Sequence, residues 1–272
     1  MNCIQIEHRY ATKSILVFRR KLCSHVGNRA TKPLGEDMHH TAQPPACAAC
    51  KLTISKRICF DKEGAGPGGC PTLNRQQLLD QAREAYSNAD VCAFAREASR
   101  QEAHGYANRH ERLYVLQPSK TRMMEICEFA HKMGYTRLGL AFCIGLSREA
   151  AQVLEILKSQ RFDVVSVACK AGRIPKEAIG ITDEDKIFQG TDEAMCNPIF
   201  QAMVLNDENT QFNILLGLCV GHDSLFFKHA QAPTTVLAVK DRVTGHNPLA
   251  AVYLSPSYYR KMMLPGGPNS NE

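Results

Sequence analysis

The second half of the chain alternates between short, almost uninterrupted apolar runs and longer segments with one apolar face. Four apolar runs have the length of strands, at residues 138–142, 164–168, 214–218 and 236–239. Runs of this kind are typical of strands that are buried on both faces of a parallel sheet. The intervening segments have the helical period, which predicts right-handed βαβ connections. We therefore expect an α/β fold with a doubly wound, mostly parallel sheet.

Helices are expected both before the sheet and between its strands. Before the sheet, the apolar period predicts helices within residues 74–86, 91–104 and 119–133. The last of these stops at Gly134, and glycine readily takes the left-handed conformation that ends helices. Further helices are expected around residues 146–157, 198–205 and 224–230.

Composition divides the chain into four regions. Residues 1–45 are a basic extension with seven Lys and Arg against three Asp and Glu. This extension is either an organelle presequence, a disordered tail, or a segment that precedes a true start at Met38. Residues 46–73 form a Cys-rich module, residues 74–255 hold the helical segment and the α/β domain, and residues 256–272 are a tail.

The distribution of charged and apolar residues argues against nucleic acids and membranes as binding partners. The chain has a formal net charge of +6, of which 7 − 3 = +4 lies in residues 1–45 and 6 − 4 = +2 in the remainder. A nearly neutral body without an aromatic and basic motif predicts no nucleic-acid partner. No apolar run approaches the roughly 18 residues of a membrane span, so no membrane partner is expected. The apolar run at residues 15–18 is also too short for a secretory signal. We expect a cytoplasmic protein, or an organellar one if residues 1–45 are a presequence.

Twelve cysteines in such a chain indicate metal binding or thiol chemistry. The first group reads Cys47-x2-Cys50-x8-Cys59-x10-Cys70. Four thiolates suffice for tetrahedral zinc or for an iron–sulfur cluster. The glycines of residues 64–69 let the chain fold back and bring in the fourth cysteine. The alternative is a set of free or disulfide-forming cysteines in a segment that has no core.

A second group of cysteines stands at the ends of predicted elements. Cys143, Cys169 and Cys219 follow predicted strands, and Cys196 directly precedes a helix start. Ligands of open α/β sheets bind at the carboxyl ends of strands, so these side chains predict a second metal site or a reactive thiol site. The alternative is that they are small apolar side chains that pack in the core.

Polar residues follow the same strand ends. They are Lys170, His222, Asp223, Lys240, Asp241, Arg242 and His246. Lys240 and Arg242 are candidates to bind a small anionic ligand or the charge of a cluster, and the alternative is a surface loop with salt bridges. No catalytic residue is identified, because no dinucleotide, phosphate-loop, nucleophile-elbow or zinc-protease motif occurs.

Longer motifs surround these residues. They read AFCIGLSREA, SVACK, CNPIFQA, LLGLCVGHDSLFFKHA and VKDRVTGHNPLAAVY. With them, residues 46–255 resemble a family of uncharacterised, predicted metal-binding proteins of archaea and anaerobic bacteria. The resemblance implies a cysteine-rich N-terminal module followed by an α/β body, and it carries no established activity.

Two functions follow from these observations. The first is a metal-binding protein that holds zinc or an iron–sulfur cluster through cysteine thiolates, with a second cysteine site at the strand ends. The second is a non-catalytic α/β module that binds a ligand or a partner and contains a structural zinc. Whether the protein is an enzyme is left open.

Overall fold

The computed structural model describes residues 43–265. Residues 1–42 of the predicted extension, including the predicted start at Met38, and residues 266–272 of the predicted tail lie outside the described residues. The chain divides after Asp80 into two compact units. The first contains the cysteine-rich module and the helical turns up to Asp80, and the second contains the remaining helices and the sheet. No helix in the described part of the chain has the length and apolar character needed to cross a membrane.

A sheet of four parallel strands forms the centre of the second unit. The strands are β1 (Arg137–Phe142), β2 (Asp163–Ala168), β3 (Phe212–Leu216) and β4 (Thr234–Ala238). Their order in the sheet is β2-β1-β3-β4. All three neighbouring pairs are parallel, so the predicted parallel sheet is confirmed. The connection from β1 leads to β2 on one side, whereas the connection from β3 leads to β4 on the other side, so the direction of the connections changes between β1 and β3. In open parallel sheets, the crevice for ligands opens at such a point, beyond the carboxyl ends of the strands.

The helices come close to their predicted positions. They are α1 (Pro71–Asn74), α2 (Gln76–Ala85), α3 (Ala89–His104), α4 (Arg122–Lys132), α5 (Ser147–Ser159), α6 (Pro198–Asp207), α7 (His222–His229) and α8 (Pro248–Tyr253). Gly134 follows α4 with φ +70°, as expected for a residue that ends a helix. Asn197 caps α6, because its side-chain oxygen accepts a hydrogen bond of 3.0 Å from the backbone N–H of Phe200.

Short 3-10 helices occur in the connections. They are η1 (Cys47–Ala49), η2 (Ile54–Lys56), η3 (Ile144–Leu146), η4 (Lys176–Ile179), η5 (Asp183–Asp185) and η6 (Arg260–Met263).

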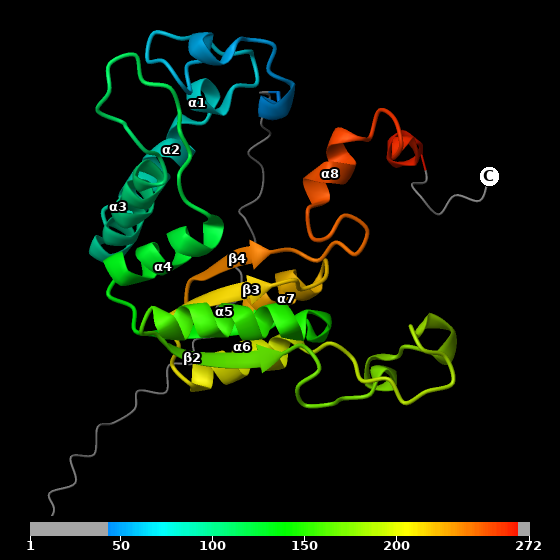
Figure 1. Cartoon of the computed structure of the whole chain (residues 1–272). Helices are drawn as coiled ribbons and strands as arrows, with labels where there is room; N and C mark the ends of the chain where they lie inside the picture. Colours follow the sequence, from blue (N-terminus) through cyan, green and yellow to red (C-terminus); the bar gives the residue numbers. More distant parts are fainter. Residues whose placement is uncertain (1–42, 266–272) are drawn as a thin grey trace, which may run out of the picture. The chain divides into compact units, whose positions relative to one another are not determined.

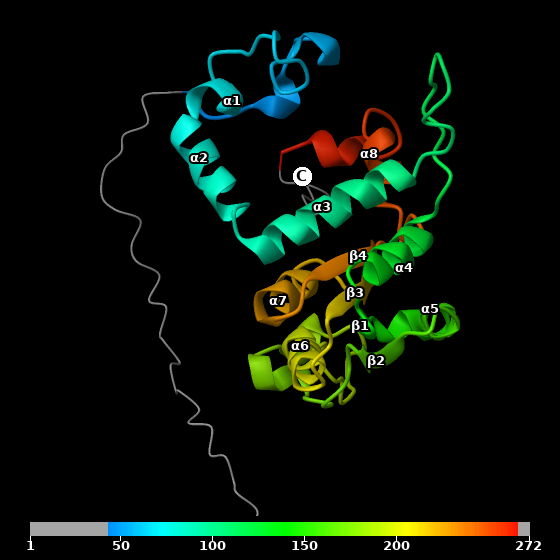
Figure 2. The same ribbon diagram turned by 90° about the vertical axis from the view of Figure 1, so that its left-hand side faces the viewer.

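Helices cover both faces of the sheet. α4 and α5 lie on one face, and α6 and α7 lie on the other (Figures 1 and 2). Side chains of the strands alternate between two apolar clusters: Leu140 and Ile214 pack with α4 and α5, whereas Ala141 and Leu215 pack with α6 and α7. This alternation explains why the strand sequences are continuously apolar, and it confirms the doubly wound arrangement.

A buried glutamine of α6 joins the carboxyl ends of β1 and β2. The side chain of Gln201 is fully buried, and its Nε2 donates hydrogen bonds to the carbonyl oxygens of Phe142 (3.2 Å) and Val167 (2.7 Å). The backbone N–H of Cys169 donates to the same Phe142 oxygen at 2.8 Å. The residues that leave these two strands are therefore held in place by α6 as well as by the sheet.

Replacing this amide by a carboxylate should destabilise the fold strongly. In Gln201→Glu, a carboxylate would face two carbonyl oxygens in a fully buried site. We expect the free energy of unfolding at neutral pH to fall by roughly 3 kcal/mol. Burial should raise the pKa of the new carboxyl, so the loss should shrink as the pH falls and the protonated group donates a hydrogen bond again.

Urea unfolding at several pH values measures this effect. The matched control is Gln152→Glu, at an exposed position of α5, which should change stability by less than about 0.5 kcal/mol. Equal effects of the two substitutions would show that the hydrogen bonds of Gln201 do not stabilise the fold.

Candidate functional site

Three of the four strand-end cysteines meet at the carboxyl edge of the sheet. The Sγ atoms of Cys169 and Cys196 are 3.6 Å apart. Cys169 also forms a side-chain hydrogen bond with Cys143 and therefore stands between the other two. Its side chain is buried, whereas Cys143 and Cys196 are partly exposed. None of the ten cysteines in residues 43–265 is in a disulfide.

The connection between β2 and α6 brings two of these cysteines together. Cys169 and Cys196 are 27 positions apart, at the two ends of this connection. The backbone N–H of Asn197 donates to the carbonyl oxygen of Cys169 at 2.7 Å, and the N–H of Met195 donates to that of Ile174 at 2.8 Å. The connection thus leaves the sheet and returns to the point where it started.

Positive side chains surround the thiols. His222, at the start of α7, forms a side-chain hydrogen bond with Cys196, and the ammonium group of Lys240 does so with Cys143. The ammonium group of Lys170 lies near Cys196 and donates to the carbonyl oxygen of Ala194. These groups come from three separate connections, so only the folded sheet assembles them.

Charges and hydrogen bonds divide the protons unequally among the three thiols. The hydrogen bond from Cys169, assisted by His222 and Lys170, holds the pKa of Cys196 well below its usual range. The hydrogen bond from Cys169, assisted by the Gly145 N–H and Lys240, lowers the pKa of Cys143 as well. Cys169 has a raised pKa, because its thiol donates to its neighbours and is buried.

The imidazole of His222 is the proton-carrying partner of the Cys196 thiolate. The Cys196 thiolate raises the pKa of His222, so the two groups favour a thiolate–imidazolium pair. Cys169 retains its proton between two ionised neighbours. One S–H proton serves one acceptor at a time, so the three thiols titrate as a coupled set. Two thiolates beside three cationic side chains make a nucleophilic site.

The remaining predicted residues have other partners. The Sγ of Cys219 accepts a hydrogen bond of 3.2 Å from the guanidinium group of Arg242. The carboxylate of Asp241 accepts from two backbone N–H groups of its own turn, and the backbone N–H of Asp241 donates to Nδ1 of His246 at 3.1 Å. The carboxylate of Asp223 accepts from the backbone N–H of the next residue at 2.7 Å. These residues organise the turns around the site.

The four cysteines of the N-terminal module line a single small cavity. Cys47, Cys50, Cys59 and Cys70 all border a space of about 40 Å³. The backbone N–H of Cys50 donates to the carbonyl oxygen of Cys47 at 3.2 Å, which closes a tight turn between these two cysteines. A Cβ at Gly66 would lie 2.8 Å from the Sγ of Cys70, so this position requires glycine.

A metal site requires more than a shared cavity, because its ligands must also point at one position. Within residues 43–265, no group of three or more His, Cys, Asp or Glu side chains is arranged so that it could hold a metal ion. The donor set of the module nevertheless fits zinc or an iron–sulfur cluster, because all four side chains are thiols that border one cavity.

The sequence analysis missed two buried polar groups near the cysteines. One is Gln201. The other is Glu193, whose carboxylate lies 3.0 Å from Nζ of Lys176 and 3.8 Å from that of Lys170, and which accepts a hydrogen bond of 2.9 Å from the N–H of Ile187. Its burial inside a long connection has no periodic signal in the sequence.

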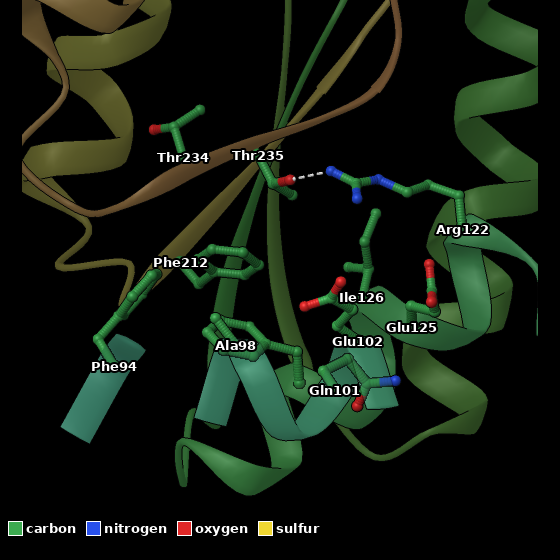
Figure 3. A pocket seen from close by; sticks show the side chains of 11 residues that line it. Phe94, Ala98, Gln101, Glu102, Arg122, Glu125, Ile126, Phe212, Thr234 and Thr235 are labelled. Carbon is green, nitrogen blue, oxygen red and sulfur yellow. Dashed lines mark hydrogen bonds between the residues drawn. The ribbon is translucent and has the colours of Figure 1, made fainter. Parts of the chain in front are cut away.

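The sequence analysis also missed a cavity of about 490 Å³. It lies near the amino ends of β3 and β4, at the end of the sheet opposite to the cysteines. Figure 3 shows Phe94 and Phe212 on its apolar side, with Arg122 reaching across to Thr235. The guanidinium group of Arg122 donates to Oγ1 of Thr235 at 2.7 Å. The carboxylates of Glu102 and Glu125 also line this cavity. It contains no cysteine.

Comparisons with known proteins give a family without an assigned activity. Residues 70–237 match the family described as "Protein of unknown function (DUF1847)". The chain is also similar to an uncharacterized protein of Methanocaldococcus jannaschii, with 50% identity over 147 residues, which are 54% of this chain and 73% of the relative. The family match includes all four strand-end cysteines and Cys70, and it begins after Cys59.

The charges around Cys196 predict how its rate of alkylation depends on pH. We expect iodoacetamide to alkylate Cys196 almost as fast at pH ~6 as at pH ~8, because its lowered pKa keeps it ionised at both values. A model peptide thiol should slow by roughly two orders of magnitude over the same range. Peptide mapping by mass spectrometry identifies the modified cysteine. A rate for Cys196 that falls in parallel with that of the peptide would contradict the assignment.

Proposed function

This chain belongs to the DUF1847 family, and we propose that it is a metal-binding protein that holds zinc or an iron–sulfur cluster through the thiolates of its N-terminal module. One observation carries the proposal: four cysteines spread over residues 47–70 border the same small cavity. Four thiolates complete the tetrahedral ligand set of a structural zinc site, so zinc is the favoured occupant.

The lack of a core in the module gives a physical reason for a metal. In residues 43–80, Cys70 is the one side chain that is buried. Apolar burial is the main favourable contribution to folding, and so small a segment requires another source of stability. Metal–thiolate bonds provide it, because ligation is coupled to folding in structural zinc sites. The site would be structural.

Removing one thiol should release the metal. Protein purified without oxygen should contain about one zinc per chain, and Cys50→Ser should contain much less and be cut within residues 46–73 by proteases. Mass spectrometry of the metals, an assay of acid-labile sulfide and limited proteolysis provide the measurements. Iron together with sulfide would assign a cluster to the same thiols.

The matched control is Cys92→Ser. Cys92 is exposed on α3 and lies outside both cysteine groups, so this substitution should leave the metal content unchanged. A metal content that is the same in Cys50→Ser and in the unsubstituted chain would refute the proposed site.

A second candidate function is supported by the large cavity. Its volume of about 490 Å³ lies within the usual range for small-molecule sites. Three phenylalanines border it: the ring centroids of Phe94 and Phe129 are 5.1 Å apart, and those of Phe129 and Phe212 are 5.5 Å apart. Two carboxylates and one guanidinium group give the lining a net negative charge. This lining suits a small ligand that has an apolar body and one positive charge.

A tryptophan reporter tests this candidate. The chain contains no tryptophan, so Phe94→Trp introduces a single fluorophore at the cavity. We expect phenethylamine to change its emission in a saturable way, and we expect the additional substitution Ala98→Leu, which narrows the cavity, to weaken the binding that causes the change. An equal response to uncharged phenylethanol would show that the carboxylates do not select the ligand.

A further inference from the structure

We propose that the strand-end cysteines carry out thiol–disulfide exchange with a small disulfide that bears carboxylates. Cys196 is the sulfur that attacks the substrate, and Cys169 is the sulfur that resolves the mixed disulfide. This activity is separate from the metal binding proposed for the N-terminal module, and it uses none of those ligands.

The distance between the two sulfurs permits a disulfide. The Sγ atoms are 3.6 Å apart, and a disulfide bond requires about 2.05 Å, so they must approach by about 1.5 Å. The hydrogen bond from Asn197 N–H to the carbonyl oxygen of Cys169 already holds the two backbone segments side by side. Side-chain rotation can therefore supply most of the approach.

Burial assigns a different role to each sulfur. Cys169 is 2% exposed, so an external disulfide does not reach it. Cys196 is partly exposed, and it faces the imidazole of His222. The thiolate is the species that attacks a disulfide, and an adjacent cation stabilises it. The exposed sulfur therefore reacts first and the buried one second.

The charges around the site indicate the class of substrate. Lys170, Lys240 and Arg242 surround the thiols, and Arg242 donates to the sulfur of Cys219. Three carboxylates lie nearby: that of Asp241 accepts hydrogen bonds from its own turn, that of Asp223 accepts one from the next backbone N–H, and that of Glu193 is paired with Lys176 and Lys170. Lys240 and Arg242 form no ion pair with these carboxylates, and they therefore favour a disulfide with carboxylates over one with amines.

The exchange has two steps that balance. In the first, the Cys196 thiolate attacks one sulfur of the substrate, a Cys196–substrate disulfide forms, and one substrate thiolate leaves. In the second, Cys169 attacks the Cys196 sulfur, the Cys169–Cys196 disulfide forms, and the second substrate thiolate leaves. The protein loses two electrons and the substrate disulfide gains them.

Cys143 has a role in the second step. Cys169 must lose its proton before it attacks, and its thiol is hydrogen-bonded to Cys143. Once Cys196 is in the mixed disulfide, it no longer carries the negative charge that raises the pKa of Cys169, and the proton passes along the existing hydrogen bond to the Cys143 thiolate. Cys143 thus acts as the base that turns the buried resolving thiol into a nucleophile.

Oxidised glutathione is the probe for the test. The full chain is reduced, desalted without oxygen, exposed to oxidised glutathione, quenched with acid and mapped by mass spectrometry. We expect a peptide pair linked through Cys169 and Cys196, and we expect Cys169→Ser to accumulate glutathione on Cys196. Cys196→Ser should form neither product, and Cys92→Ser should behave as the unsubstituted chain. The cationic disulfide cystamine should react several-fold more slowly.

A further variant keeps all three thiols. In His222→Gln the link should still form, but about tenfold more slowly at pH ~6, with a smaller difference at pH ~8, because the cation beside Cys196 is lost. Glutathione that stays on Cys196 in the unsubstituted chain, or a link that forms equally fast in His222→Gln at both pH values, would overturn the proposal. So would thiols that react only after a bound metal is removed from them by a chelator.

Discussion

The hydrogen bond from the backbone N–H of Asn197 to the carbonyl oxygen of Cys169 is the contact on which the carboxyl edge of the sheet depends. It joins the end of β2 to the start of α6 across a long connection that has few buried apolar side chains. Gln201, one turn further along α6, then bonds to the ends of β1 and β2. Three strand-end residues are in this way fixed relative to one helix.

Charge is the second constraint on this edge. Two thiolates would repel each other at close range, and burial would disfavour both of them. A protonated Cys169 between them and the cations of Lys170, His222 and Lys240 around them offset this cost. The same balance leaves Cys196 ionised and accessible, so the arrangement that stabilises the cluster also makes one of its sulfurs reactive.

The cysteine-rich module illustrates a different way of using thiols. The strand-end cysteines lie on a framework that the apolar core already holds. In the module, by contrast, Cys70 is the one buried side chain of residues 43–80, and four sulfurs border a cavity of about 40 Å³. We propose that thiols in the first setting react, whereas thiols in the second stabilise the module by binding a metal. Composition alone does not separate these two groups of cysteines.

The apolar pattern by itself determined the α/β class, the four strands to within a few residues and the end of α4 at Gly134, because local burial and backbone preference have short periods along the chain. It also placed Cys143, Cys169 and Cys219 at strand ends. Only the tertiary structure decided the strand order, the contact of Cys169 with Cys196, the pairing of Cys219 with Arg242 and the cavity beside Phe94 and Arg122. These features join residues that are far apart in the chain, and such contacts arise from the path of the connections, which leaves no periodic mark in the sequence.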